Sequence, residues 1–504
     1  MTAAEQAETV RFLETAAFPG ETVTRIDTHL SHVFLTPTRA WKMKRAVHFP
    51  FADFTAVDQR RAAIAREFEI NRRTAPALYL GVHPVTRMGD RLALGGPGTP
   101  VDWLLEMVRF ADADRLDRVL EDGRLTPVLL AALADRVAQA HLSAPGAEQV
   151  QPVSQTVAGV AKGLLENPAT RGDTHARAWC EGAEAAAKAL GPWLAARARH
   201  GFARACHGDL HLGNLCLYEG EPTPFDAIEF NRALTDIDVL YDLAFLLMDL
   251  WFRGHRGDAA RVLSRYLSAT RDYRGLRALP LFISLRAAVR AMVLGLGDSA
   301  REEEARAYAR FAADVLAAPA APRLFAVGGL SGTGKSTLAA ALAPHAGGAP
   351  GAVVISSDVT RKRLWGVAPE TRLPPEAYGE DVSDAVRARM MHDGARALAA
   401  GHPVILDATF LRPSWRDAAA ALAARADVAF APVWLEAPDD TLRARIAGRT
   451  GDPSDATVTV LERQMETGEP PIDWPHLAAD APGETRLAAA CALTGLTYSA
   501  RGQA

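Results

Sequence analysis

The first part of the chain alternates apolar and polar residues in short runs that are typical of β-strands. A break at Pro37-Thr38 and a turn at Gly89-Asp90 indicate hairpins. One segment instead spaces its apolar residues at the intervals of a helix. Strands are expected over residues 22–47, 78–94 and 101–110, and the helix over residues 55–73. The pattern predicts a β-rich lobe over residues 1–110.

Beyond residue 110 the apolar spacing becomes helical. Helices are expected over residues 133–142, 176–190, 236–251, 258–269, 279–294 and 301–316. A stretch rich in Ala and Pro follows over residues 317–323, and its composition is typical of a linker. An α-rich lobe is therefore predicted over residues 111–316.

The pattern changes again after this stretch, where continuous apolar runs alternate with helical segments. Strands are expected over residues 324–327, 353–355, 404–406 and 428–434. Runs without polar alternation are typical of a parallel sheet covered on both faces. The sequence thus predicts an α/β domain with a parallel sheet over residues 323–504.

Composition and charge narrow the classes of partner. The 504 residues are 49% hydrophobic, with a net charge of -4 and interleaved charges, so a strong attraction to nucleic acid is not indicated. No apolar run approaches the ~20 residues that a membrane helix needs. The four cysteines form no CxxC pair. We expect a cytoplasmic protein without a membrane partner.

A first motif spans His207-Gly-Asp-Leu-His-Leu-Gly-Asn214. The catalytic loop of protein kinases needs a carboxylate for the substrate hydroxyl and, five residues later, an amide oxygen for a metal ion. Asp209 and Asn214 have this spacing. A second metal-binding carboxylate is expected on a nearby strand, and Asp226 follows a dozen residues downstream. The motif predicts phosphoryl transfer with Mg²⁺.

This loop resembles that of the aminoglycoside phosphotransferase and choline kinase family, whose pattern HGDxHxxN is completed by His211. The resemblance covers roughly residues 20–310. It implies an α+β, protein-kinase-like bilobal domain that uses ATP to phosphorylate a small-molecule hydroxyl. The segment before Lys42 lacks the Gly-rich loop of protein kinases.

Such a fold needs a strand lysine for the phosphates and a helix glutamate to pair with it. Lys42 and Lys44 lie on the same side of a strand by its period of two, so either can serve, and Lys44 is narrowly preferred. Glu67 on the following helix is the expected partner. The backbone groups of Leu104-Leu-Glu-Met107 are expected to contact adenine.

A second motif, Gly329-Leu-Ser-Gly-Thr-Gly-Lys-Ser336, is a complete P-loop between a predicted strand and helix. Its backbone N–H groups close around phosphates, Lys335 reaches the β/γ-phosphates and Ser336 binds magnesium. The expected nucleotide-binding residues are Gly329, Leu330, Ser331, Gly332, Thr333, Gly334, Lys335, Ser336 and Thr337. Asp407, at the end of an apolar run, is the expected second metal ligand.

The arrangement of Asp358 and Arg361 resembles that of P-loop kinases such as gluconate kinase, polynucleotide kinase and the zeta toxins. The resemblance covers roughly residues 323–475. It implies that Asp358 approaches the acceptor hydroxyl and that Arg361 holds the substrate. Arg445 and Arg449 are candidates for a lid arginine that offsets charge on the γ-phosphate.

Our leading hypothesis is a bifunctional ATP-dependent phosphotransferase, each half of which phosphorylates a hydroxyl of a small molecule with Mg²⁺. One alternative makes the P-loop half a kinase of nucleic-acid ends. Another makes one half a non-catalytic nucleotide-binding module. Both motif sets are intact, which favours the leading hypothesis.

Overall fold

The computed structural model describes residues 3–49, 52–294, 299–318, 321–448, 453–466 and 472–498. Contacts within the chain form two compact units. The first comprises Met1–Pro152 and Trp193–Leu243, and the second comprises Val153–Pro192 and Ala244–Ala504. Every helix within the described ranges is too short or too polar to cross a lipid bilayer.

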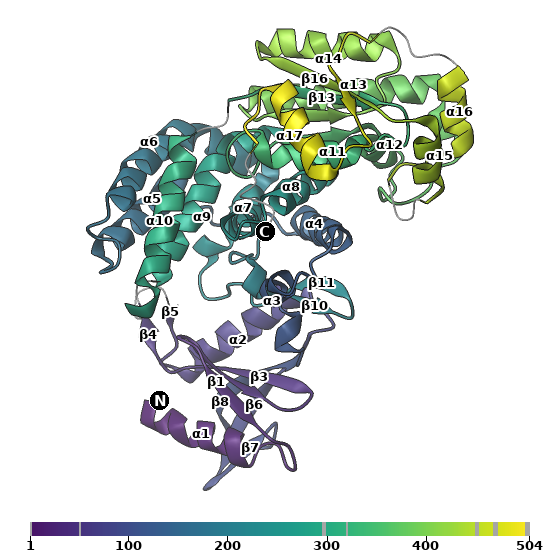
Figure 1. Ribbon diagram of the computed structural model, residues 1–504. Helices are drawn as coiled ribbons and strands as arrows, with labels where there is room; N and C mark the ends of the chain where they lie inside the picture. The colour runs from purple at the N-terminus through teal and green to yellow at the C-terminus, as the bar shows by residue number, and fades with distance from the viewer. Residues whose placement is uncertain are drawn as a thin grey trace. The chain divides into compact units, whose positions relative to one another are not determined.

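The first unit is built on an antiparallel sheet whose strand order, among the described residues, is β1-β2-β3-β8-β6-β7 (Figure 1). Its strands are β1 (Thr24–Asp27), β2 (Ser31–Leu35), β3 (Arg39–Lys44), β6 (Tyr79–Met88), β7 (Arg91–Leu94) and β8 (Thr99–Val108). The turn between β2 and β3 contains Pro37-Thr38, and that between β6 and β7 contains Gly89-Asp90. The predicted hairpins are confirmed.

Helices cover both faces of this sheet. Helix α1 (Ala3–Thr15) packs its Leu13 with Trp41 and Met43 of β3, whereas α2 (Val57–Arg72) packs Ile64 against Leu105 of β8. Because alternate residues of a strand face opposite sides, the intervening lysines of β3 face α2. A short hairpin, β4 (His48–Phe49) and β5 (Ala52–Asp53), connects the sheet to α2.

The remaining elements of the first unit position two loops. They are α3 (Leu116–Glu121), α4 (Pro127–Ser143), β9 (Ala203–Ala205), β10 (Leu215–Tyr218), β11 (Glu221–Pro224), β12 (Asp236–Asp238) and the start of α7 (Val239–Phe252). Strand β9 pairs with β12, and β10 pairs with β11, in both cases antiparallel. The loop after β9 carries Asp209 and the turn after β11 carries Asp226.

The second unit contains a helical part and a parallel sheet. The helices are α5 (Val153–Glu166), most of α6 (Thr174–Arg197), α8 (Arg256–Thr270), α9 (Leu279–Leu294) and α10 (Glu302–Ala317). Helix α9 packs against α5 and α10. The bounds of α9 are those predicted, whereas α5 lies where no helix was expected.

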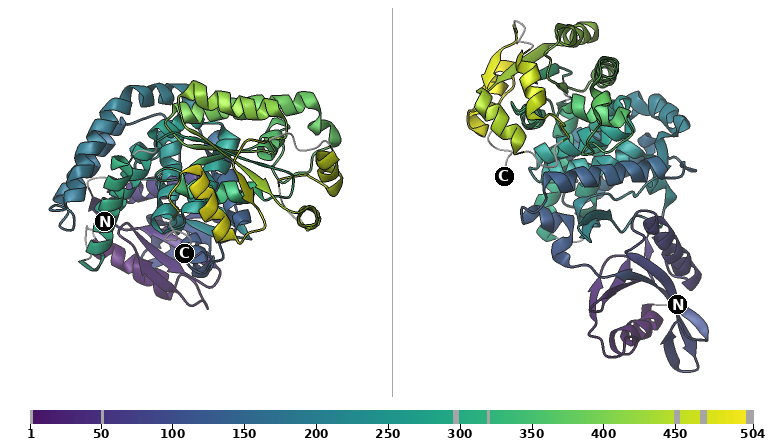
Figure 2. Two further views of the ribbon diagram at one scale, coloured as in Figure 1. Left: turned by 45° about the horizontal axis from the view of Figure 1, so that its top comes forward. Right: turned by 90° about the vertical axis from the view of Figure 1, so that its right-hand side faces the viewer.

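The parallel sheet, within the described residues, has the strand order β14-β15-β13-β16-β17, and helices lie on both of its faces (Figure 2). Its strands are β13 (Leu324–Gly329), β14 (Val353–Ser356), β15 (Val404–Asp407), β16 (Phe430–Glu436) and β17 (His476–Ala478). The helices are α11 (Lys335–Leu342), α12 (Ser357–Leu364), α13 (Glu380–Ala399), α14 (Pro413–Ala426), α15 (Asp439–Ala447), α16 (Val458–Glu466) and α17 (Gly483–Thr494). The predicted fold class is confirmed: an α+β part precedes an α/β part. We call the elements up to α10 the kinase-like part and the elements from β13 onwards the P-loop part; α5, α8, α9 and α10 of the kinase-like part belong to the second unit.

One helix of the kinase-like part contributes to the core beneath the parallel sheet. Ala260 of α8 belongs to the same buried cluster as Phe325 and Val327 of β13 and Leu338 of α11. Helix α8 also contacts β14, the strand at one edge of the sheet. The core of the P-loop part therefore includes a residue from before residue 317.

Candidate functional site

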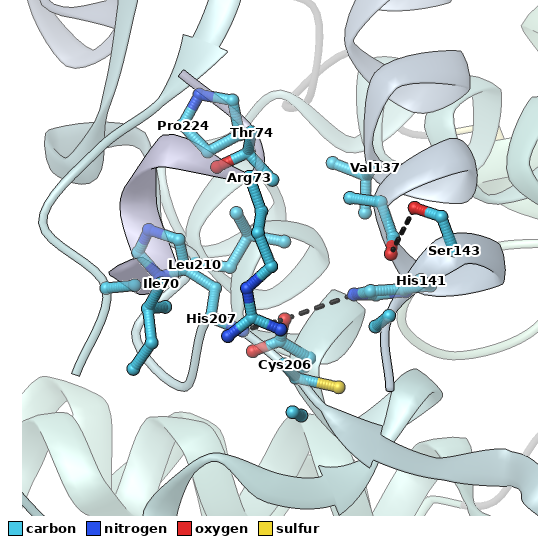
Figure 3. Close-up of a pocket in the computed structure, with 15 residues that line it drawn as sticks. Ile70, Arg73, Thr74, Val137, His141, Ser143, Cys206, His207, Leu210 and Pro224 are labelled. Carbon is cyan, nitrogen blue, oxygen red and sulfur yellow. Dashed lines mark hydrogen bonds and ion pairs between the residues drawn. The ribbon is translucent and has the colours of Figure 1, made fainter. Parts of the chain in front are cut away.

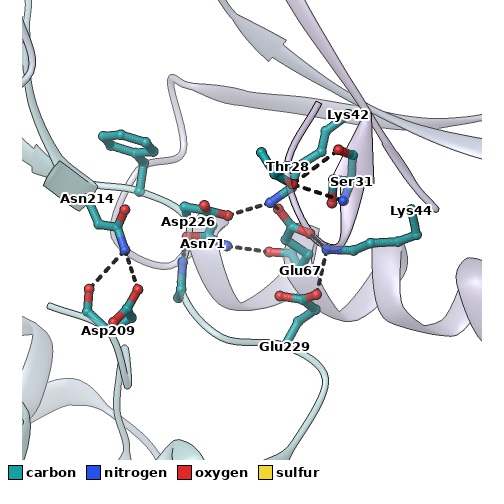
Figure 4. Close-up of polar contacts among 12 residues, drawn as sticks. Thr28, Ser31, Lys42, Lys44, Glu67, Asn71, Asp209, Asn214, Asp226 and Glu229 are labelled. Atoms are coloured by element: carbon teal, nitrogen blue, oxygen red, sulfur yellow. Dashed lines mark hydrogen bonds and ion pairs between the residues drawn. The ribbon is translucent and has the colours of Figure 1, made fainter. Parts of the chain in front are cut away.

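Asp209 and Asn214, the predicted catalytic pair, are in direct contact (Figure 4). The Asn214 Nδ2 donates to Asp209 Oδ2 at 2.7 Å and to the Asp209 backbone oxygen at 3.0 Å. Since the amide nitrogen is used in this way, Asn214 Oδ1 is the side-chain atom that can bind a cation. Close by, the His211 Nε2 lies 3.4 Å from Asp209 Oδ2.

The carboxylate of Asp242, in the first turn of α7, holds the start of this loop. It accepts the backbone N–H groups of His207 at 3.1 Å and Gly208 at 2.8 Å. The His141 Nε2 lies 3.1 Å from the same carboxylate, beside a cavity of about 70 Å³ (Figure 3). His141, Cys206 and Asp242 place metal-ligating atoms within 4.8 Å of one another. Because the Asp242 carboxylate already accepts two backbone N–H groups, we interpret these three residues as a brace for the loop.

Two further features fix the loop. Gly208 has a φ of 85°, and a Cβ at this position would lie 2.8 Å from the backbone oxygen of Leu234. Burial lowers the pKa of His207, which keeps the imidazole neutral at pH 7. Its Nε2 therefore donates to the backbone oxygen of Phe225 at 2.9 Å, which links the loop to the turn that carries Asp226.

Asp226 sits in a left-handed backbone conformation, with a φ of 61°. Its N–H donates to the Tyr79 Oη at 2.9 Å, and the next N–H, that of Ala227, donates to the Asn71 Oδ1 at 2.9 Å. Burial would raise the pKa of Asp226, but the Lys42 ammonium, with a smaller contribution from Lys44, more than offsets this effect and the pKa lies below its usual value. The carboxylate is thus held ionised next to Lys42.

The two candidate lysines have different surroundings. The Lys42 Nζ lies 2.7 Å from Glu67 Oε1 and also contacts Asp226 Oδ1. The Lys44 Nζ lies 2.6 Å from Glu67 Oε2 and 2.5 Å from Glu229 Oε1. The expected partner, Glu67, therefore meets both lysines, and the narrow preference for Lys44 stays a prediction. Only Lys42 of the two is observed next to Asp226 (Figure 4).

Met107 lies near the end of β8, opposite Ala40 of β3. Its side chain is partly buried against a cluster that includes Leu78 and Leu105. Strand β8 lies between β3, which carries Lys42, and β6, and the proposed contact between the Met107 backbone and adenine stays a prediction.

The P-loop joins β13 to α11 as predicted. Gly329, Gly332 and Gly334 all have positive φ, and a Cβ on Gly329 would lie 2.6 Å from the backbone oxygen of Leu435. The Lys335 Nζ donates to the backbone oxygen of Leu330 at 2.9 Å, and Thr333 Oγ1 does so at the same distance. Thr337 is an exposed residue of α11.

Ser336 and Asp407, the two predicted metal ligands of the P-loop part, are hydrogen-bonded. Strands β13 and β15 are neighbours in parallel register, with Val327 opposite Asp407, so the P-loop follows directly beside this carboxylate. The Ser336 Oγ donates to Asp407 Oδ2 at 2.7 Å. Burial raises the pKa of Asp407 to about 6, although Lys335 and the Ser336 hydroxyl oppose the increase.

Asp358 and Arg361 both lie on α12, which begins at the end of β14. Ser356, the last residue of β14, lies opposite Asp407 of the neighbouring strand β15, so α12 begins beside this carboxylate. The negative charge of Asp358 contributes to the raised pKa of Asp407. Arg361 is buried, and its guanidinium donates to the backbone oxygen of Ala377 at 2.6 Å and stacks over the Tyr378 ring at 4.9 Å. It therefore anchors the segment around Tyr378.

Of the two candidate lid arginines, Arg445 alone lies in the described part of the chain. The Arg445 Nη2 donates to the backbone oxygen of Ala479 at 3.0 Å, whereas Arg449 lies outside the described residues. The role of each stays a prediction.

Two residues that sequence reasoning missed contact this site. Gln464 of α16 accepts the N–H of Ser331 in the P-loop at 3.0 Å. Asp455 contacts the Lys362 Nζ at 2.6 Å and the Tyr378 Oη at 2.5 Å. Both contacts join residues more than 70 positions apart in the sequence. No local spacing could have indicated these contacts. The one available signal was the rarity of lysine, because Lys362 is one of only six lysines in the sequence.

Comparisons with known proteins match the C-terminal part of the chain to a family and most of the chain to two relatives. Residues 324–471 match the AAA domain family. The uncharacterized protein Rv2004c of Mycobacterium tuberculosis (strain ATCC 25618 / H37Rv) is 32% identical over 456 residues, which cover 86% of this chain and 88% of that protein. The uncharacterized protein Mb2027c of Mycobacterium bovis matches with the same identity and coverage.

Two solved structures are similar to portions of the chain. A choline/ethanolamine kinase family protein from Mesorhizobium loti covers 63% of this chain and 94% of its own, with 18% identity and a TM-score of 0.39. A gluconokinase from Sinorhizobium meliloti covers 34% of this chain and 92% of its own, with 24% identity and a TM-score of 0.26.

Proposed function

The chain belongs to the same family as the mycobacterial protein Rv2004c, and we propose that each of its two parts transfers the γ-phosphate of ATP to a hydroxyl group of a small molecule. The observation that carries this proposal is the convergence of Lys42, Glu67 and Asp226, which come from three separate segments of the first unit. A phosphate-binding lysine, its glutamate partner and a metal-binding carboxylate are the parts that kinases of this kind require.

In the first part, Asp209 orients the acceptor hydroxyl and takes its proton. Its contact with Asn214 holds the carboxylate in the loop, and the brace from Asp242 fixes the loop. Lys42 is assigned to the phosphates, because it lies beside Asp226 whereas Lys44 is enclosed by Glu67 and Glu229. Positioning and charge supply most of the catalysis in phosphoryl transfer.

In the second part, the P-loop N–H groups and Lys335 bind the nucleotide phosphates. Asp358 lies two residues after Ser356, which is opposite Asp407 in the sheet, and is assigned to the acceptor hydroxyl. Ser336 and Asp407 supply oxygen atoms that lie close together. Arg361 holds the wall of this site through Ala377 and Tyr378.

Both parts suit Mg²⁺, a hard cation that prefers carboxylate, amide and hydroxyl oxygens. Asn214 and Asp226 would hold it in the first part, and Ser336 and Asp407 in the second. When bound, the cation neutralises charge on the phosphates. The four cysteines are free thiols, which suits the reducing cytoplasm in which we place both activities.

The test is an ATP-consumption screen over sugars, amino sugars, aminoglycosides, nucleosides and oligonucleotides. It compares the wild type with Asp209→Asn and Lys335→Ala. Asp209→Asn should reduce one activity by about 10²–10⁴-fold, the usual contribution of a general base, and leave the other unchanged. Lys335→Ala should do the reverse. Unchanged turnover in both variants would exclude the proposal, and a response to oligonucleotides alone would favour nucleic-acid ends as the acceptor of the second part.

A further inference from the structure

The first site contains a second buried lysine beside Lys42. Lys42 and Lys44 are two residues apart on β3, and each pairs with a different oxygen of Glu67, at 2.7 and 2.6 Å (Figure 4). Lys44 also pairs with Glu229 at 2.5 Å. Glu67 is therefore held from both sides.

The two lysines differ in their freedom to change partner. The side chain of Lys44 is 2% exposed, and its two carboxylate partners are 0% and 4% exposed. Lys42 instead contacts Asp226, whose side chain is 45% exposed. Lys42 thus lies at the open edge of the cluster, where a ligand can reach it, whereas Lys44 is closed off by protein.

The charges of the cluster explain why an enclosed lysine matters. When the phosphates of a nucleotide bind, Lys42 must turn towards them and leave Asp226 free for the metal ion. Glu67 would then depend on one lysine that is shared with the ligand. A fully buried carboxylate without a stable partner is strongly penalised. Lys44 removes this dependence, because its contact with Glu67 does not involve the ligand.

We propose that Lys44, supported by Glu229, is a positioning residue that fixes Glu67 and thereby orients Lys42 in the first phosphotransferase site. The role rests on the proposed function of that site. Lys44 touches neither the nucleotide nor the acceptor and acts through Glu67. Glu229 balances the second positive charge, so that Glu67 is not the only carboxylate between two ammonium groups.

The test replaces the pair in a way that keeps the net charge of the cluster. The double variant Lys44→Met, Glu229→Gln removes one positive and one negative charge and leaves Glu67 with Lys42. If Lys44 positions Glu67, the kcat of the first activity should fall at least tenfold, because misplacement by about 1 Å can cost as much as 10²-fold. The second activity, measured on the same preparation, should be unchanged. Because Lys44 and Glu229 lie in the first unit and the P-loop lies in the second, folding of the first unit is checked separately by the far-UV circular dichroism spectrum and thermal unfolding, which should match those of the wild type.

A kcat of the first activity within twofold of the wild type in the folded double variant would overturn the positioning role. If that variant does not fold, Lys44→Gln with Glu229→Gln keeps a polar, uncharged side chain at both positions, and a fall of about fivefold in kcat is expected; an unchanged kcat would again overturn the role. Asp209→Asn runs in parallel. If Asp209→Asn abolishes turnover but the double variant retains it, the positioning role of Lys44 is wrong and the proposed function of the first site stands. If no turnover depends on Asp209, the proposed function of the first site fails and this role fails with it.

Discussion

The Ser264 hydroxyl of helix α8 accepts a hydrogen bond from the backbone N–H of Val354 at 3.0 Å. Val354 belongs to β14, the edge strand of the parallel sheet, and an edge strand leaves a row of N–H groups without a neighbouring strand. A side chain from the kinase-like part thus satisfies a backbone donor of the P-loop part. Arg265, the next residue of α8, pairs with Glu370 at 2.8 Å.

This packing predicts that enlarging a small residue of α8 destabilises the P-loop part. Ala260→Leu adds volume inside a filled core, and such overpacking typically costs about 1–3 kcal/mol. The midpoint of thermal unfolding of the full chain should fall. Arg261→Leu, an exposed position on the same helix, is the matched control and should leave the midpoint unchanged. An unchanged midpoint in Ala260→Leu would contradict close packing of this position in the core.

The loop that carries Asp209 should not tolerate a side chain at Gly208. Gly208→Ala combines a positive φ with a Cβ that lies 2.8 Å from a backbone oxygen. The first activity should fall more than tenfold, because the loop must shift away from its brace at Asp242. Gly220→Ala is the control, since Gly220 also has a positive φ but its Cβ would meet nothing within 4 Å. Equal effects of both changes would argue against a fixed loop.

Gln464 should influence nucleotide affinity through charge. Gln464→Glu keeps an oxygen that accepts the Ser331 N–H but adds a negative charge beside the nucleotide phosphates. Repulsion at this range in a protein interior is worth at least about 1.4 kcal/mol, so the KM for ATP of the second activity should rise about tenfold. Thr459→Glu places the same charge at an exposed position of α16 and should leave this KM unchanged. An unaltered KM in Gln464→Glu would contradict the prediction.

His402 makes stability depend on pH. Burial lowers its pKa to about 4, against a smaller opposite effect of its hydrogen bond to Gly351, so the folded state holds the neutral imidazole. Since the folded pKa lies below the unfolded value, the stabilisation is complete above about pH 6.5 and is lost as the pH falls towards 4, by up to about 3 kcal/mol.

The measurement compares thermal unfolding at pH 7.5 and pH 4.5. His402→Gln should reduce the difference between the two midpoints, because Gln does not acquire a charge. His392→Gln, at an exposed position of α13, should retain the difference seen in the wild type. A difference that His402→Gln leaves intact would assign the pH dependence to other groups.

Local spacing and the positions of the predicted strands were enough to predict one pair of residues in each site. Asp209 and Asn214 lie five residues apart and do touch, and Ser336 and Asp407 each follow an apolar strand that the pattern located. Parallel neighbours in a sheet bring such strand ends together.

The remainder could not be predicted because it depends on contacts between distant segments. A strand period of two places Lys42 and Lys44 on the same side and cannot tell which one meets Asp226. The contact between Gln464 and the P-loop joins residues 133 positions apart. The place of α8 under the parallel sheet likewise follows from packing, which the apolar spacing of one helix does not specify.

The left-handed backbone conformation at Asp226 determines which substitution can test the role of its carboxylate. Asn tolerates this conformation about as well as Asp, whereas residues such as Ala pay a conformational penalty there. Asp226→Asn therefore removes the charge and keeps the turn, but Asp226→Ala changes both. Loss of activity in an alanine scan at this position would mix a backbone effect with an electrostatic one, and only the isosteric amide separates them.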